Sequence, residues 1–81
     1  MSEVQDAGPL TYGQKAVGLR FNPSMDSAVD VCKQRYADAI DEMDVLRSSS
    51  DSKEQKRLAS IAITDLQKAQ MMSVKAITWE D

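Results

Sequence analysis

Hydrophobic residues recur at steps of mostly three and four through two long stretches of the chain. In the first stretch the recurring residues are Val29, Cys32, Tyr36, Ala39, Ile40, Met43 and Leu46. This spacing places them in one stripe along a helix, which predicts a helix from about residue 23 to about residue 47. In the second stretch, Ser52 and Gln55 have capping-box spacing and strong helix formers follow, which predicts a helix from about residue 53 to about residue 78.

The segment between the two predicted helices is the short polar run SSSDS, at 48–52. At a rise of about 1.5 Å per residue, each helix would be about 37 to 39 Å long. A short connection makes two consecutive helices antiparallel neighbours. The expected fold class is therefore all-α, an antiparallel two-helix hairpin that follows a short irregular or extended N-terminal segment.

The chain before the first predicted helix has little periodicity. Residues 1–13 are polar, acidic and interrupted by glycine and proline, which predicts a flexible lead-in. Residues 14–21 are expected to form a short extended segment, so that 14–81 make up one hairpin domain. Asn22 and Pro23 form a favourable helix start, because asparagine caps well and proline fits the first helical position; Ser24 is a competing cap.

The second predicted helix carries two adjoining apolar arcs. One arc consists of Leu58, Ile61, Ala62, Leu66, Ala69, Met72 and Ala76, and the other of Ile63, Val74 and Ile77, with Gln70 between them. A hairpin of two helices covers only one arc, and the chain has neither a disulfide nor a metal to stabilise it. We therefore expect the second arc to meet other copies of the chain. Alternatively, residues 1–22 fold back over that arc.

Composition narrows the possible functions. The net charge of −3 and the pI of about 4.8 disfavour binding to DNA, which depends on clustered cations. The chain has no histidine and one cysteine, Cys32, so zinc sites and the usual catalytic triads are not expected. We expect no catalytic residue, metal or cofactor, and we expect Cys32 to be a buried structural thiol. Since no apolar run of membrane-spanning length exists, we expect a cytoplasmic protein without membrane contact.

One stretch, GLRFNPS at 18–24, differs from ordinary amphipathic helix. If a helix starts at Asn22 and Pro23, its unpaired N–H groups and positive dipole end lie beside Arg20, and such a corner attracts phosphate. Phe21 could stack on a base. The alternative is a capped helix start in which Phe21 fills the core and Arg20 is solvated.

Lys33 lies about ten residues further along, roughly 15 Å of helix rise from that corner. Across a two-fold contact, Lys33 of one copy could face Arg20 of another, which would create an anion site only in the oligomer. The alternative for Lys33 is an ion pair with Asp30 in its own helix.

Three segments together resemble a known family. They are TYGQKAVGLRFNPS, then VCKQRYADAID, then KRLASIAITDLQKAQMMSVKAITW, and they cover about residues 11 to 79. They resemble the phage proteins of the anti-CBASS and anti-Thoeris hairpin-domain family, which act as sponges for cyclic nucleotide immune signals. The resemblance implies a hairpin assembled as a trimer of dimers.

The resemblance also implies a ligand and a set of site residues. Family members bind cyclic dinucleotides in pockets between subunits, and some bind cyclic trinucleotides or a cyclic ADP-ribose isomer. In such members a tyrosine of the N-terminal segment stacks on a base and a lysine of the next helix meets phosphate. Tyr12 and Lys33 are the nearest matches, with Phe21 as a competing stacker. Beyond Arg57 the second helix offers only Lys68 and Lys75 as cations, where some members present an arginine.

The function expected is sequestration of cyclic oligonucleotide messengers, cyclic dinucleotides above all, without cleavage. This would block CBASS-type signalling in the infected bacterial cell. Its expected nucleotide-binding residues are Tyr12, Arg20, Phe21, Asn22 and Lys33. The alternative is a small helical, oligomeric protein-interaction module with no nucleotide ligand.

Overall fold

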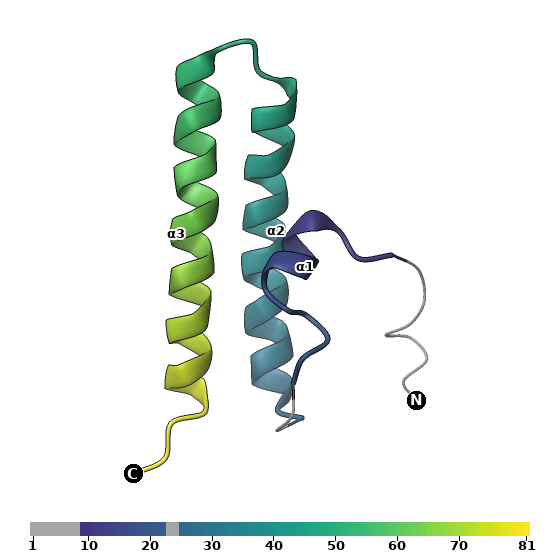
Figure 1. Ribbon diagram of the computed structural model, residues 1–81. Coiled ribbons are helices and arrows are strands. Elements are labelled where there is room, and N and C mark those ends of the chain that lie inside the picture. Colours follow the sequence, from purple (N-terminus) through teal and green to yellow (C-terminus); the bar gives the residue numbers. More distant parts are fainter. Residues whose placement is uncertain (1–8, 23–24) are drawn as a thin grey trace.

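The computed structural model describes residues 9–22 and 25–81, and within them it has three helices and no strand. Helix α1 spans Tyr12–Ala16, α2 spans Ser27–Ser49 and α3 spans Lys53–Ile77. Helices α2 and α3 run antiparallel as a hairpin, and α1 packs against α2 (Figure 1). The predicted all-α hairpin is therefore confirmed for the single chain.

The molecule is flat. Its dimensions are 43 × 34 × 12 Å, and its radius of gyration of 14.1 Å exceeds the value of about 12 Å that is typical of a compact chain of this length. Packed helices lie about 8 to 10 Å apart, so a body this thin has no second complete layer to cover the hairpin. The buried hydrophobic residues are correspondingly few: Val17, Val29, Ala37, Ile40, Ala59 and Ile63.

Helix α3 packs on α2 through a different face from the one predicted. Ile63, expected to face other copies, is only 2% exposed and belongs to the core cluster with Ile40 and Ala37. Hydrogen bonds fix the contact: Tyr36 and Ser73 pair through their hydroxyl oxygens at 2.9 Å, and Arg47 donates to Ser60 Oγ at 3.3 Å.

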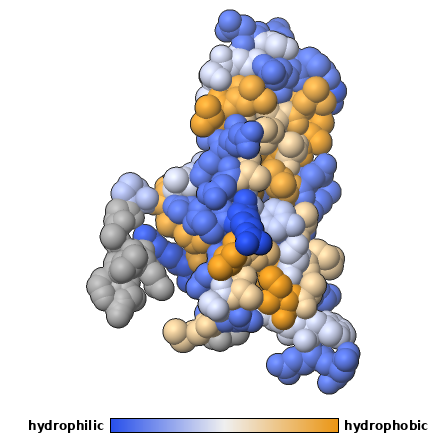
Figure 2. Space-filling model, turned by 180° about the vertical axis from the view of Figure 1, so that it is seen from behind, coloured by the Kyte–Doolittle hydropathy of each residue, from blue (hydrophilic) through white to orange (hydrophobic). Residues whose placement is uncertain are grey.

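The apolar surface left uncovered lies instead on the other arc of α3. We call Leu58, Ile61, Ala69, Met72 and Ala76 the outer α3 row; all five are exposed. Leu58, Ile61 and Met72 retain 53%, 44% and 65% of their accessible surface. Hydrophobic surface also gathers on the back of the molecule, in its upper part and again lower down (Figure 2).

Residues 12–20 form a helix and a turn in place of the predicted lead-in and extended segment. Residues 14–21 were expected to be extended, but α1 continues to Ala16 and a turn follows at 17–20. The helix forms because Thr11 and Gln14 make a complete capping box, each side chain bonding the other's backbone N–H at 3.0 Å. The predicted boundary between residues 13 and 14 thus falls inside α1.

Gly13 allows α1 to dock on α2. A Cβ atom added at Gly13 would overlap the carbonyl oxygen of Ala37, so only glycine fits this crossing. The Gly13 N–H donates to Asp41 Oδ1 at 2.7 Å, which ties the first turn of α1 to the middle of α2.

Helix α2 begins later than predicted. Its N-cap is Asp26, whose carboxylate accepts from the Ala28 N–H at 2.9 Å, so the helix starts at Ser27 instead of at about residue 23. Pro23 and Ser24 lie outside the described residues. The start of α3 agrees with the sequence, since Ser52 caps it and accepts from the Gln55 N–H at 3.1 Å. Among the helices described, none is long and apolar enough to cross a bilayer.

Candidate functional site

The chain makes a sharp turn at Gly18–Phe21, the segment between α1 and the start of α2. Gly18 adopts a φ of +62°, a conformation that side chains rarely allow, and the Phe21 N–H closes the turn on the Gly18 carbonyl at 2.9 Å. We call this segment the 18–21 turn. The turn places Arg20 and Phe21 beside the first half of α2.

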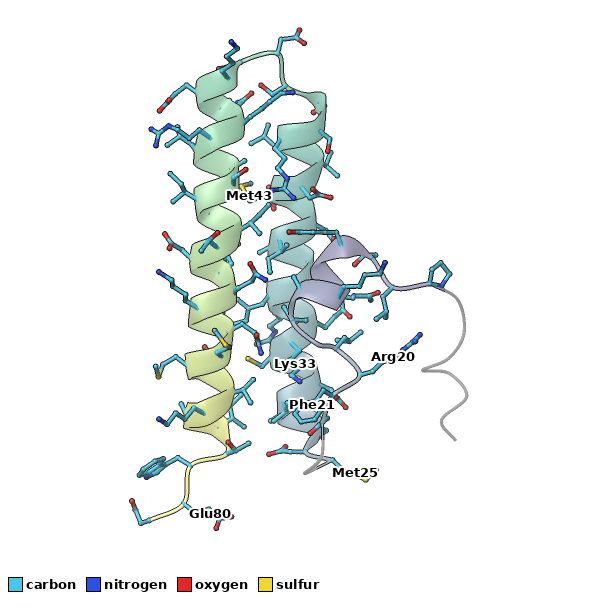
Figure 3. All side chains as sticks on the ribbon, viewed as in Figure 1. Arg20, Phe21, Met25, Lys33, Met43 and Glu80 are labelled. Carbon is cyan, nitrogen blue, oxygen red and sulfur yellow. The ribbon has the colours of Figure 1, made fainter. Side chains whose placement is uncertain are left out.

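Lys33 on α2 stabilises the 18–21 turn through hydrogen bonds to its backbone. Its ammonium donates to the carbonyl oxygens of Gly18, at 3.0 Å, and of Phe21, and it lies 5.5 Å from the centre of the Phe21 ring. Lys33 is 5% exposed, so the predicted phosphate ligand is largely buried within its own chain. An ammonium has three N–H donors, and the described carbonyls accept from two of them. Figure 3 shows Lys33 extending from α2 toward Phe21.

Two of the alternatives considered for this region are wrong. Phe21 is 71% exposed and does not fill the core. Lys33 does not pair with Asp30, whose carboxylate instead accepts from Asn22 Nδ2 at 2.8 Å. Asn22 Nδ2 also donates to the Asp26 carbonyl at 2.9 Å, so Asn22 is a bracing residue before α2 and not its cap.

The helix N-terminus that was expected at Asn22 lies instead at Asp26 and Ser27. The first turn of α2 is capped by the carboxylate of Asp26, which already occupies its positive end. An anion bound near Arg20 must rely on side chains more than on the helix dipole.

An open groove of about 510 Å³ runs beside the 18–21 turn. It is lined by Leu19, Arg20, Asn22, Met25, Asp30, Val31 and Gln34, and we call it the Arg20 groove. Its volume lies within the range of about 300 to 1,000 Å³ that is common for small-molecule sites. Arg20 and Asp30 give it one cationic and one anionic side. The Arg20 side chain points away from the helices (Figure 3).

Tyr12, the predicted base stacker, lies at a different place. Its ring packs 5.1 Å from the Arg47 guanidinium, in the C-terminal half of α2. Arg47 Nε also donates to Asp44 Oδ1 at 3.0 Å, and its Nη1 reaches Ser60 on α3. Hydrogen bonding to Tyr12 and then to Asp44 raises the pKa of Arg47 above its ordinary value. Tyr12 remains 43% exposed.

The five predicted binding residues thus divide into two groups within one chain. Arg20, Phe21, Asn22 and Lys33 gather at the 18–21 turn, whereas Tyr12 lies beside Arg47. Lys33 and Arg47 are 14 positions apart on α2, which is about 21 Å of helix. Within one chain the Tyr12 ring contacts Arg47, whereas the Lys33 ammonium contacts the 18–21 turn.

Sequence reasoning missed Arg47 and Asp41. Arg47 joins all three helices and Asp41 anchors α1, yet both lie on a charged stretch of α2 that looks like an ordinary solvated face. The spacing of Arg47 from Asp44 suggests a pair within α2, and no pattern in the sequence indicates the contacts that Arg47 and Asp41 make with α1. The half-buried Cys32 was expected to be fully buried.

The described part of the chain contains no group of three or more metal-ligating side chains. A flat helical hairpin with a docked N-terminal helix, an open groove and a turn held by a lysine defines a small all-helical hairpin protein. The family model for the Acb2/Tad1 hairpin domain matches residues 14–78, and the chain therefore belongs to this family of anti-CBASS and anti-Thoeris sponge proteins.

Members of the family bind their signal molecules and do not cleave them. The match includes the 18–21 turn, Lys33 and both long helices, whereas Tyr12 lies just outside it. No curated protein and no solved structure matches the chain.

Proposed function

We propose that the protein binds and sequesters cyclic oligonucleotide messengers, cyclic dinucleotides above all, and leaves them uncleaved. In the cytoplasm of a phage-infected bacterium this would block CBASS-type signalling. Membership of the Acb2/Tad1 hairpin-domain family is the observation that carries the proposal. Cyclic trinucleotides and cyclic ADP-ribose isomers are secondary ligand classes.

The site in this proposal is shared between copies of the chain. Because Tyr12 packs on Arg47 and Lys33 on the 18–21 turn of the same chain, a second copy would complete the ligand site. A cyclic dinucleotide has two phosphates related by near two-fold symmetry, so a two-fold dimer that offers Arg20 and the remaining Lys33 donor from each copy suits it. Tyr12 or Phe21, both exposed, would stack on the bases.

Exposed apolar surface supports the assembly in this proposal. The outer α3 row has no covering layer in the single chain, and a face of this kind is typical of an interface between subunits. We propose a trimer of dimers. Sequestration then works by mass action, and it requires a Kd near or below the concentration of the signal; a Kd of about 1 nM corresponds to about −12 kcal/mol.

Calorimetric titration against cyclic di- and trinucleotides and a cyclic ADP-ribose isomer, with light scattering for mass, tests the proposal. We expect tight binding of at least one cyclic dinucleotide and recovery of that ligand intact after the protein is heat-denatured. Arg20→Ala should weaken binding, and Lys56→Ala, an exposed cation at the far end of α3, is the matched control. Absence of binding across the panel would overturn the proposal, and a cleaved ligand would indicate an enzyme.

The uncovered outer α3 row also fits a second candidate, a helical protein-interaction module without a nucleotide ligand. In that case Arg20→Ala would leave function unchanged in cells, whereas Ile61→Asp would abolish it. Under the sponge proposal both changes reduce function, the first without altering the mass of the assembly.

A further inference from the structure

A second groove, of about 560 Å³, lies between the N-terminal half of α2 and the last turn of α3. It is lined by Ala28, Val31, Cys32, Arg35, Tyr36 and Ile77, and we call it the Arg35 groove. The lining is largely apolar, and Arg35 is the charged residue in it. The volume is large enough to accept a side chain from another molecule. The Arg35 groove shares only Val31 with the Arg20 groove.

An exposed aromatic residue follows α3 at the same end of the molecule. Trp79 is 64% exposed, and its indole Nε1 donates only to the neighbouring Asp81 Oδ1, at 3.0 Å. The acidic residues Glu80 and Asp81 follow Trp79, and we call 79–81 the tail (Figure 3 labels Glu80). An indole is a large apolar group with one polar end, a combination that is enriched at interfaces.

The tail is tied to the end of its own helix. The Thr78 N–H and hydroxyl donate to the Val74 carbonyl at 3.0 and 2.9 Å, and the Trp79 N–H donates to the Ala76 carbonyl at 3.4 Å. Trp79 is not among the residues that line the Arg35 groove of its own chain. The groove and the indole are thus both open. The start of α2 and the end of α3, which carry them, lie at the same end of the hairpin (Figure 1).

We infer that the Arg35 groove receives Trp79 from a second copy of the chain, with Arg35 facing Glu80 and Asp81 of that copy. Groove and tail have opposite charge at their polar ends. Because they share one end of the molecule, a two-fold axis beyond that end lets two copies exchange tails reciprocally and fill both grooves at once. The inference rests on the self-association within the proposed function, and it does not depend on nucleotide recognition.

Trp79 is the only tryptophan in the chain, so its fluorescence reports this contact directly. As the concentration of ligand-free protein rises, we expect the emission to shift to shorter wavelength and quenching by acrylamide to fall. Trp79→Ala should weaken self-association at least about tenfold, as expected for a buried interface tryptophan. An indole that is as accessible to acrylamide in the associated protein as in the dilute chain would overturn the inference.

Charge reversal tests the role of Arg35. Arg35→Glu places three acidic groups together and should weaken self-association severalfold, and adding Glu80→Lys and Asp81→Lys should restore it. Lys56→Glu is the control, because it makes the same change of charge at the opposite end of α3. Equal effects of Arg35→Glu and Lys56→Glu, or no rescue by the lysines, would contradict the pairing.

The single cysteine, Cys32, lies in the groove and allows a cross-link that identifies the donor of the tail. Glu80→Cys keeps Trp79, and mild oxidation should join Cys32 of one chain to the new cysteine of another, as shown by peptide mapping of a covalent dimer. A disulfide within one chain would show that the chain's own tail fills the groove, against the inference. The Glu80→Cys, Cys32→Ser variant is the control for links between two tails.

These measurements are made without nucleotide, so their failure is distinct from failure of the proposed function. If Trp79 is shielded but no ligand of the panel binds, the sponge proposal is wrong and the tail exchange is supported. If the assembly binds a nucleotide but Trp79 stays exposed, the tail exchange is wrong and the sponge proposal is supported.

Discussion

At the scale of single residues, Gly13 determines whether α1 can dock. An alanine Cβ would overlap the Ala37 carbonyl oxygen and would lie 2.9 Å from Asp41 Oδ1. Backbone at a helix crossing cannot give way as a flexible side chain can, so Gly13→Ala should cost about 1 to 3 kcal/mol of folding free energy. Urea denaturation measures this loss. Lys15→Ala, an exposed change on the same helix, is the control, and equal midpoints for the two variants would contradict the close contact.

Lys33 has a structural role that can be separated from ligand binding. Lys33→Met keeps the apolar stem and removes the ammonium, which leaves the Gly18 and Phe21 carbonyls without this donor. We expect a loss of about 1 to 3 kcal/mol in stability together with weaker nucleotide binding. Thermal denaturation without ligand measures the first effect and titration the second.

Lys56→Met is the control for Lys33→Met, because it removes the same charge from an exposed position on α3. Unchanged stability of Lys33→Met would mean that the 18–21 turn holds its shape without the ammonium. A loss of binding in that case would assign Lys33 to the ligand alone.

At the scale of elements, the contribution of the α2 N-cap to the free energy of folding can be measured. Asp26→Ala removes the acceptor for the Ala28 N–H and should destabilise the protein by about 1 kcal/mol. Hydrogen exchange should also quicken in the first turn of α2. Asp51→Ala, an exposed aspartate just before the cap of α3, is the control. Equal stability of the two variants would show that another group caps α2.

The sequence predicted the helical hairpin well because its signals are local. The start of α3 depends on Ser52 and the helix formers after it, and the structure agrees to the residue. The start of α2 was placed four residues early, since Asn22, Ser24 and Asp26 are all good caps. The Asn22 side chain donates to the Asp26 carbonyl and the Asp26 carboxylate caps the helix, a choice among three caps that the sequence pattern does not make. Helix α1 was missed although Thr11 and Gln14 have capping-box spacing, because five residues make no periodic pattern.

The candidate site was less predictable, because its contacts join distant parts of the chain. The sequence suggested Lys33 as a cation that meets phosphate. In the structure its ammonium instead donates to backbone carbonyl groups twelve and fifteen residues earlier in the chain. The pairing of Tyr12 with Arg47 depends on where α1 docks, which Gly13 and Asp41 determine together. These contacts join residues that are not at a characteristic helical or turn spacing, so the sequence pattern does not predict them.

At the scale of the whole molecule, the two adjoining arcs of α3 provide a matched pair of tests. Ile63 is 2% exposed in the core and Ile61 is 44% exposed on the outer α3 row, only two residues away. Ile63→Asp buries a charge against Ile40 and should cost at least about 3 kcal/mol, enough to unfold a small domain. Far-UV circular dichroism and urea denaturation of the dilute chain measure the loss.

Ile61→Asp should behave differently, because its carboxylate stays in water when the chain is alone. We expect the dilute variant to keep its helical spectrum, with a stability within about 0.5 kcal/mol of the unchanged chain. Its solution mass by light scattering should fall below that of the unchanged protein, because an uncompensated charge in an apolar contact opposes association. Because Ile61 lies on an uncovered face of α3 and Ile63 in the core, a charge at Ile61 should affect assembly and a charge at Ile63 should affect folding. If the unchanged chain has the mass of one copy at micromolar concentration, or if Ile61→Asp leaves the mass of the assembly unchanged, the outer α3 row is not the surface through which copies meet.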